Sequence, residues 1–338
     1  YMKIVNSKSL VQNNTFKIDV NTKFFVDITS ESDLLNLLQE TRFKNIKKLI
    51  LGGGSNILLT KNINGLTIHN QIKGINIKKE TDKYIFVSVG AGEVWDDLVV
   101  WTTKKKLYGI ENLSLIPGYV GAAPIQNIGA YGVEFIDVFE ELRGVDLSTN
   151  KIKILTKNDC EFGYRDSIFK HRLKNKFIIT EITIKLSKIK KLKTSYTSLS
   201  KELKKLKKDN ITSQTIREII IDIRNEKLPN PHFIGNAGSF FKNPIITKQT
   251  LTKIKKLYPD VPVFEKGKEI KISAAWLIEK TNWKGYRSGE CGVYNKHALI
   301  LINYGKAVGK DIINLSRKIK ATVKKKFNIN LEEEVTIL

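Results

Sequence analysis

The feature that most restricts the fold is residues 109–132, GIENLSLIPGYVGAAPIQNIGAYG. This segment is rich in glycine and proline and predicts a long loop between regular elements. Long loops inside compact domains are usually functional. Its glycines leave backbone amides free to meet a ligand, and Gln126 and Asn127 can bond the edge of an amide or imide ring; the glycines are Gly118, Gly121, Gly129 and Gly132.

A second glycine-rich stretch, GGGSN at residues 52–56, lies between two strand-like runs. Three consecutive glycines allow positive φ and close approach of the backbone to a ligand. Successive amides in such a turn can form an anion-binding nest, and Ser55 and Asn56 add polar side chains. A simple hairpin turn explains the motif equally well. Taken together, the two loops suggest a large ligand with a diphosphate and a flat ring.

The remaining pattern predicts an α+β protein. Helices and strands are mixed without the regular βαβα rhythm of a doubly wound sheet. The expected strands lie on both sides of GGGSN within 47–60, at 84–90, about 136–147, 177–187, 298–303 and the final EVTIL; the expected helices lie at 94–106, about 212–226, 271–281 and 309–327. The segment KLPNP, at 227–231, ends the helix expected at about 212–226, because the residue before a proline disfavours the α conformation. It is the best candidate for a domain boundary.

Length and composition indicate a soluble protein of about two domains. The chain has 338 residues, of which 41% are hydrophobic and 27% charged. No apolar run reaches the ~18 residues of a membrane span, and the start, YMKIVNSKSL, lacks the features of a secretory signal. Cys160 and Cys291 are isolated, which suggests a reducing compartment and no zinc site. We therefore expect a cytoplasmic protein with no metal and no membrane partner.

The net charge of +24 raises the alternative of a nucleic-acid-binding protein. The lysines are spread over most of the chain, with local runs at 188–193 and 201–208. No nucleic-acid-binding motif accompanies them, and the abundance of Lys, Ile and Asn is typical of an AT-rich coding sequence. The same positive field would attract a small anionic substrate. We therefore expect no nucleic-acid partner.

Two nucleotide-binding motifs can be set aside. GAGEVW, at 90–95, follows a strand and opens a helix, as a dinucleotide fingerprint does. However, Trp95 occupies the third glycine position, and Glu93 would place a negative charge beside a pyrophosphate. No G-x-x-x-x-G-K-[ST] sequence occurs, which excludes a P-loop.

Three further stretches carry residues with possible chemistry. Ser239, in GNAGSFFKNP, does not fit the G-x-S-x-G elbow and has no assignable base, so the residues alone favour a turn serine. Arg165 could form a local ion pair with Asp166 or bind a carboxylate in bidentate fashion. In LEEEV, alternation places Glu332 and Glu334 on one face and Glu333 on the other, and spacing alone does not choose among them.

Together these stretches resemble one family, the UDP-N-acetylenolpyruvoylglucosamine reductases. The resemblance rests on motifs that occur in the family's order and cover nearly the whole chain: LGGGSNIL, LIPGYVGAAPIQNIGAYGVE, YRDSIFK, KLPNP, GNAGSFFKNP and LEEEV. The segment KTSYTSLSKEL, at 193–203, resembles the tyrosine loop of the type I subgroup.

The resemblance implies a two-lobed FAD-binding region of the vanillyl-alcohol-oxidase type and a separate α+β substrate-binding domain. The implied domains are 1–68 and 69–224 for the two FAD lobes, with 328–338 returning to them, and 225–327 for the substrate. The implied FAD-binding residues are Gly52, Gly53, Gly54, Ser55, Asn56, Gly118, Gly121, Ala122, Gly129 and Arg224. Ala122 and Ala123 stand where some relatives carry hydroxyl residues, and backbone amides are expected to serve instead.

The resemblance also implies the chemistry. NADPH would reduce a non-covalently bound FAD, which would then deliver hydride to the enolpyruvyl ether of a UDP-sugar in peptidoglycan synthesis. By this likeness Arg165 and Glu334 stabilise the charge that develops, and Ser239 donates the proton. The residues implied to contact the UDP-sugar are Tyr164, Tyr196, Lys227 and Asn243. A monomer is expected. The rival within this fold is an oxidase, which has no reason to keep the set of Arg165, Ser239 and Glu334.

Overall fold

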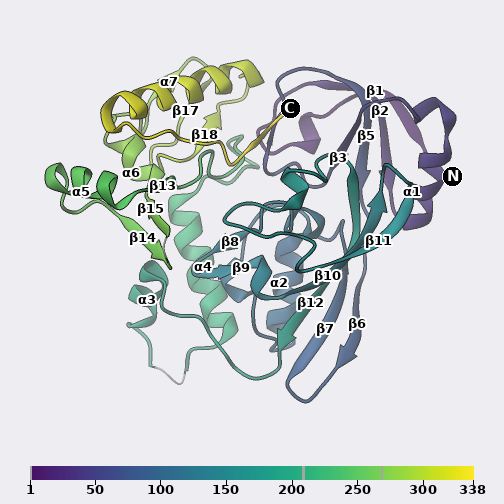
Figure 1. The fold of residues 1–338 in the computed structure, drawn as a ribbon, viewed down its shortest axis with the longest axis horizontal. Helices are drawn as coiled ribbons and strands as arrows, with labels where there is room; N and C mark the ends of the chain where they lie inside the picture. The colour runs from purple at the N-terminus through teal and green to yellow at the C-terminus, as the bar shows by residue number, and fades with distance from the viewer. Residues whose placement is uncertain (1, 208–209, 268) are drawn as a thin grey trace. The chain divides into compact units, whose positions relative to one another are not determined.

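The computed structural model describes residues 2–207, 210–267 and 269–338 (Figure 1). The chain forms two compact units, each built from separate stretches of sequence. The first comprises Tyr1–Lys8, Asn21–Gly53 and Ile63–Glu226, and the second comprises Ser9–Val20, Gly54–Asn62 and Lys227–Leu338. The division into functional domains at 1–68, 69–224 and 225–327 stays a prediction.

One sheet of the first unit is partly parallel. Its strands follow the order β1-β2-β5-β3, with bounds β1 Ile4–Ser9, β2 Asn21–Ile28, β3 Lys48–Leu51 and β5 Ile63–Asn70. Strands β2 and β3 both pair with β5 in parallel. Helix α1, Glu31–Gln39, starts after Ser30, whose side chain accepts a hydrogen bond from the amide of Asp33. Its buried Leu34 and Leu37 join the core of this sheet.

The other sheet of the first unit is antiparallel. Its five strands follow the order β11-β10-β12-β7-β6 (Figure 1), with bounds β6 Ile75–Glu80, β7 Tyr84–Gly90, β10 Phe139–Asp146, β11 Lys151–Thr156 and β12 Phe177–Ser187. Helix α2, Trp95–Lys104, buries Trp95, Leu98 and Val99 in the same hydrophobic core as the inner residues of β7. The strands expected at 84–90 and 177–187 and the helix expected at 94–106 are therefore confirmed.

Two helices complete the first unit. Helix α3, Thr197–Leu203, packs Leu199 and Leu203 against Ile216 and Ile220 of α4, Ser213–Lys227. Helix α4 ends two residues before Pro229, as the sequence predicts. Short strands β8, Gly129–Ala130, and β9, Val133–Glu134, form a small hairpin at the end of the glycine-rich loop.

Among its described residues, the second unit has short strands and three α-helices. Its helices are α5 Lys248–Leu257, α6 Ala274–Glu279 and α7 Gly309–Phe327. Its strands are β4 Ile57–Leu58, β13 Ile245–Ile246, β14 Val263–Lys266, β15 Glu269–Ile272, β16 Arg287–Ser288, β17 Cys291–Val293, β18 Leu301–Asn303 and β19 Thr336–Ile337. Helix α7 buries an apolar stripe and exposes its lysines, as the amphipathic pattern predicts.

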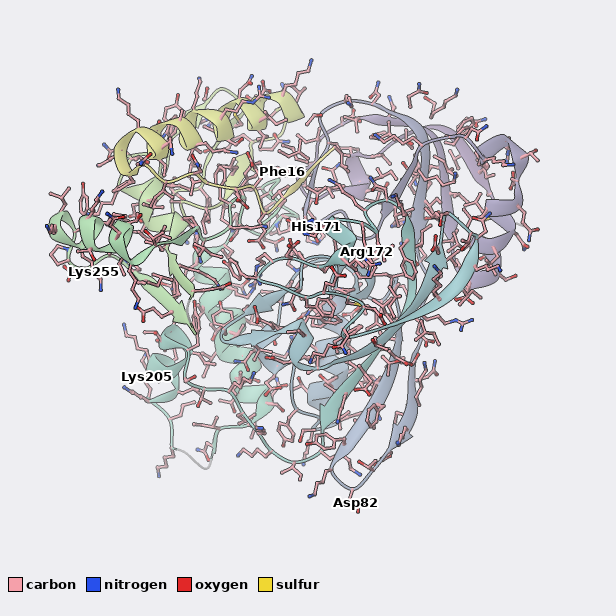
Figure 2. All side chains as sticks on the ribbon, in the orientation of Figure 1. Phe16, Asp82, His171, Arg172, Lys205 and Lys255 are labelled. Atoms are coloured by element: carbon pink, nitrogen blue, oxygen red, sulfur yellow. The ribbon has the colours of Figure 1, made fainter. Side chains whose placement is uncertain are left out.

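The structure corrects or decides several predictions. The helix expected over 271–281 begins only at Ala274, because Ser273 caps α6 and the preceding residues pair as β15. The GGGSN stretch is not a hairpin turn, because β3 before it pairs with β5 and β4 after it pairs with β19. No helix among the described residues has the length and hydropathy of a membrane span. Of the predicted lysine runs, Lys205 lies on the surface after α3 (Figure 2), and Lys208 lies outside the described residues.

Candidate flavin and substrate site

In the first unit the two glycine-rich loops meet. A Cβ atom placed on Gly53 would lie 3.1 Å from Cα of Gly118 and 3.3 Å from the ring of Tyr119. A Cβ atom placed on Gly52 would lie 3.5 Å from the same side chain, which is an ordinary van der Waals contact. A side chain at position 53 would require the facing backbone of Gly118 to move by a few tenths of an ångström, so glycine at this position favours the close approach of the two loops. The sequence predicts that both loops bind one large ligand, and in the structure the two loops lie against each other at Gly53 and Gly118.

The middle of the 109–132 loop is fixed by backbone hydrogen bonds. Gly121 donates to Ala91 at 2.8 Å, and Ala122 donates to Tyr119 at 3.0 Å. A Cβ on Gly121 would lie 2.7 Å from Cβ of Ala91. The expectation that these two amides are free for a ligand is therefore wrong. Gly121 is needed because a side chain here would collide with Ala91. Any contact of this stretch with FAD would therefore use groups other than the amides of Gly121 and Ala122.

Arg165 lies against the end of the same loop. Its guanidinium donates to the carbonyl oxygen of Gly129, and a second nitrogen donates to that of Asn127 at 3.4 Å. A Cβ on Gly129 would approach Nη1 of Arg165 to 2.9 Å, so the glycine makes room for the cation. Asp166, which the sequence offered as a local partner of Arg165, instead has Oδ2 2.8 Å from Nε2 of His171. The guanidinium of Arg165 thus lies against the end of the loop that the sequence predicts to bind the flavin.

A polar cluster of the first unit fits a bound cofactor. The Nε atom of Arg224 on α4 is buried and has no hydrogen-bond partner among the described residues. A buried unpaired donor is costly, and a carbonyl or anionic group of a ligand would satisfy it. Tyr131, beside this arginine, has a pKa raised by burial, so its phenol stays protonated and can donate. The residues present therefore fit FAD at this place.

Tyr196 adjoins that cluster. It precedes the first residue of α3, and its ring meets the ring of Tyr131 edge to face at 5.4 Å. The side chain of Tyr196 is 38% exposed. Tyr164 precedes Arg165, whose guanidinium lies 5.6 Å from the centre of the Tyr164 ring. Both tyrosines predicted to contact substrate therefore lie in the unit that carries Arg165.

In the second unit Ser239 lies between two backbone partners. Ser239 bridges to Ile300, and the next residue, Phe240, donates to Leu299 at 2.8 Å. On the other side, the amide of Glu334 donates to the carbonyl oxygen of Phe240 at 2.8 Å. Phe240 is fully buried, and the centre of its ring lies 6.3 Å from that of Phe16. The fold thus anchors the serine and brings the C-terminal acid beside it.

The three acids of LEEEV have different surroundings. Glu332 is 77% exposed. Both oxygens of Glu333 accept hydrogen bonds from Nζ of Lys320 on α7, at 2.8 and 2.9 Å. The carbonyl of Glu334 accepts a hydrogen bond from Nδ2 of Asn56 at 3.2 Å. The side chain of Glu333 is thereby bound to α7. The backbones of all three acids pair with residues 240–242, and the backbone of Glu334 also bonds the side chain of Asn56 in the GGGSN stretch.

Two other predicted residues also belong to the second unit. Lys227 is exposed at the end of α4. Burial, followed by the charges of Lys227 and Lys284, lowers the pKa of His297, so this imidazole is neutral near pH 7. Oδ1 of Asn243 accepts a hydrogen bond from the amide of Ala274 at 2.9 Å, which ties this predicted substrate residue to the start of α6.

Sequence reasoning missed three structural residues of the first unit. Arg217 on α4 donates to both oxygens of Asp96 on α2, at 2.6 and 2.7 Å. Asp96 also accepts from the amide of Leu115, within the 109–132 loop, at 2.5 Å. Asn112, fully buried in that loop, bonds two carbonyl oxygens. No local sequence signal identifies these residues, because their partners are distant in the chain.

The fold, with its glycine-lined loops, is that of an FAD-dependent oxidoreductase. Residues 22–156 match the FAD binding domain, and residues 230–338 match the UDP-N-acetylenolpyruvoylglucosamine reductase C-terminal domain. The expected α+β class, with an FAD-binding region of the vanillyl-alcohol-oxidase type and a separate C-terminal domain, is confirmed.

Relatives agree over the full length. The UDP-N-acetylenolpyruvoylglucosamine reductase of Flavobacterium johnsoniae is 44% identical over 100% of both chains. That of Buchnera aphidicola is 48% identical over 98% of both. The crystal structure of the Thermus caldophilus enzyme covers 100% of this chain and 98% of its own, with a TM-score of 0.69 and 22% identity. The chain belongs to the UDP-N-acetylenolpyruvoylglucosamine reductase family.

Proposed function

We propose that the protein reduces the enolpyruvyl group of UDP-N-acetylglucosamine enolpyruvate, with NADPH as reductant, to form UDP-N-acetylmuramate for peptidoglycan synthesis. The observation that carries the proposal is the placement of Glu334 beside the backbone of the Ser239 segment, through its hydrogen bond to Phe240. Besides a hydride source, this reaction requires a proton donor, which we assign to Ser239, and an acid that stabilises the substrate carboxylate, which we assign to Glu334. Membership of the reductase family supports the same reaction.

Each residue of the set has a distinct task. When bound, FAD supplies the hydride for the vinyl carbon. Negative charge then grows on the neighbouring carbon and spreads into the substrate carboxylate, where Arg165 and Glu334 stabilise it. Ser239 protonates that carbon. A serine hydroxyl is a poor acid in water, but the acceptor is strongly basic, so no separate catalytic base is needed.

The rest of the substrate is held away from the reacting carbons. Lys227 supplies a positive charge suited to the diphosphate, and Tyr164, Tyr196 and Asn243 contact the UDP-sugar. The glycine-rich stretches, with Arg224, hold FAD without a covalent link, because none of the four histidines lies within either loop; they are His69, His171, His232 and His297. We infer a cytoplasmic monomer.

The experiment is an anaerobic measurement of both half-reactions. Purified protein that carries FAD is mixed with NADPH, and bleaching of the flavin absorption is recorded. The UDP-enolpyruvyl sugar is then added, and recovery of the flavin band with formation of UDP-N-acetylmuramate is expected. UDP-N-acetylglucosamine, which lacks the enolpyruvyl group, is the control and should cause no recovery. Rapid recovery with oxygen but none with the enolpyruvyl sugar would instead indicate an oxidase.

A further inference from the structure

Asn112 joins the 109–132 loop, which the proposed function places on FAD, to the segment that carries the proposed substrate contact Tyr196. Its side chain is fully buried within the 109–132 loop. Its amide nitrogen donates to the carbonyl oxygen of Tyr131 at 2.8 Å and to that of Lys193 at 2.9 Å. The two hydrogens of one amide group therefore link the end of the glycine-rich loop to the segment that leads into Tyr196.

The chemistry of the amide determines its orientation. Both partners are carbonyl oxygens, which only accept hydrogen bonds, so the nitrogen of Asn112 must face them. Its Oδ1 atom is buried and has no partner among the described residues. An aspartate at 112 has the same shape but would place an oxygen against two carbonyls.

The carbonyl groups that Asn112 holds belong to the segments that carry a pair of tyrosine rings. Tyr131 lies at φ +50°, which is uncommon for a residue with a side chain. Gly132 follows at φ +81°, and a Cβ placed there would lie 4.0 Å from Cβ of Tyr196. Tyr131 and Tyr196 meet at 5.4 Å between ring centres. A shift of either backbone would therefore move Tyr196 relative to the loop.

Two more contacts hold the segment between Lys193 and Tyr196. One lies at the surface, and the other lies after Tyr196 in the chain. Nζ of Lys193 lies 2.7 Å from Oδ2 of Asp137, and both side chains are substantially exposed, so this ion pair contributes little. Helix α3, which starts after Tyr196, packs on α4 through Leu199 and Leu203. Between these contacts, Asn112 provides the buried hydrogen bond nearest to Tyr196 on its N-terminal side.

We propose that Asn112 is a positioning residue that sets Tyr196 for contact with the UDP-sugar by clamping the main chains of Tyr131 and Lys193. The proposal rests on the proposed function, because it takes Tyr196 as a substrate contact. Asn112 touches neither substrate nor the reacting atoms. Its loss should weaken substrate binding through Tyr196 while the chemistry at Ser239 proceeds.

The test compares Asn112→Ala and Asn112→Asp with the wild-type holoenzyme. We expect KM for the UDP-enolpyruvyl sugar to rise by up to roughly tenfold, the fold-change that corresponds to losing one hydrogen bond between Tyr196 and the sugar. The value of kcat should stay within about twofold, and the rate of flavin reduction by NADPH should not change. Asn112→Asp should be at least as impaired as Asn112→Ala, because it adds repulsion.

A double-mutant cycle separates positioning from a general structural role. In the Tyr196→Phe background, which lacks the hydroxyl that Asn112 would position, Asn112→Ala should raise KM by much less than in the wild type. Equal, additive effects in both backgrounds would overturn the proposal, as would loss of FAD and of both half-reactions together in the Asn112 variants.

If the Asn112 variants do not fold, Lys193→Ala tests whether the surface ion pair, rather than Asn112, positions the segment. This variant removes an exposed side chain and leaves the carbonyl group in place, so KM should change by less than about threefold. A larger rise would show that the surface pair with Asp137, rather than Asn112, holds the segment. If UDP-enolpyruvyl sugar fails to reoxidise the wild-type flavin at all, the proposed function fails; normal turnover with unaltered KM in the Asn112 variants contradicts only this inference.

Discussion

The amide of Glu334 donates a 2.8 Å hydrogen bond to the carbonyl oxygen of Phe240. Phe240 follows Ser239 directly, so this bond, together with that from the amide of Lys242 to Glu332, places the backbone of Glu334 beside the serine proposed as proton donor. Phe240 is fully buried, which makes the attachment rigid. The relationship turns two motifs from distant parts of the chain into one candidate site.

Ser239→Ala should separate the two half-reactions. The variant should keep FAD and be reduced by NADPH at the wild-type rate, because the hydroxyl acts only on the second substrate. Reoxidation by the enolpyruvyl sugar should slow beyond the ~10²–10⁴-fold that general acid–base groups usually contribute. Stopped-flow absorbance of the flavin measures both steps. Ser288→Ala, at an exposed site of the same unit, is the control; recovery near the wild-type rate in Ser239→Ala would leave Ser239 as a turn residue.

Glu334→Gln and Glu333→Gln should differ in turnover. Glu334→Gln should reduce kcat sharply at unchanged FAD content, because a carboxyl group that can hold a proton is lost beside the reacting centre. Glu333→Gln should leave kcat almost unchanged. It should lower thermal stability slightly, because the partly exposed ion pair with Lys320 is removed. Equal and mild effects on kcat from both variants would mean that the catalytic acid lies elsewhere.

Lys227→Ala and Tyr196→Phe should mainly raise KM for the UDP-sugar. Their proposed contacts lie away from the reacting carbons, so they contribute binding energy that the ground state and the transition state share. Steady-state kinetics at saturating NADPH provide the measurement, with Lys248→Ala and Tyr84→Phe as controls at exposed positions. A large fall in kcat at constant KM would place either residue in the chemistry.

Asp96→Asn should destabilise the first unit and lessen its sensitivity to acid. Arg217 is left nearly buried without its partner, which costs about 3 kcal/mol. Burial acts to raise the pKa of Asp96, but hydrogen bonds from Arg217 and Leu115 outweigh it, and the pKa lies below 3.8. The stabilisation is thus complete above pH 3.8 and is lost as pH falls through the lower folded-state value.

Urea unfolding between pH 7 and pH 3 tests this prediction. Asp97→Asn is the matched control, because Asp97 is exposed in the same helical turn and shares only its interaction with the helix dipole. Identical unfolding free energies for the two variants at pH 7 would contradict the role assigned to the Asp96–Arg217 pair.

Gly54→Ala should disrupt the GGGSN stretch and reduce FAD content. Gly54 has φ +61°, and a Cβ there would lie 2.0 Å from the carbonyl oxygen of Asn13. Gly289→Ala is a matched control, since Gly289 has φ +58° but nothing within 4 Å of an added Cβ. Flavin absorbance per protein should fall in the first variant only. Full FAD occupancy in both would show that this backbone does not shape the cofactor site.

Much of the local structure could be predicted from the sequence. Helical spacing of apolar residues predicts α2 and α7, and alternation predicts β7, because these signals are held within a few neighbouring residues. The order of the glycine-rich motifs was enough to indicate the family. The sequence analysis did not predict helices α1 and α5. It predicted that α6 begins at residue 271, before Ser273, because the pairing that makes β15 a strand involves residues distant in the chain.

For the candidate site, too, some features follow from the sequence and others only from the tertiary structure. By itself the sequence determined which residue types are present: a serine after a flexible glycine, an arginine in YRDSIFK, and three consecutive acids. Only the tertiary structure decided that Glu333 faces Lys320, and that Asn56 bonds Glu334 across 278 positions of the chain. Hydrogen bonds at such separations depend on which backbones the fold brings within about 3 Å, and no local pattern records that choice. The buried amide of Asn112 is specified for the same reason, by two carbonyl groups that only folding brings together.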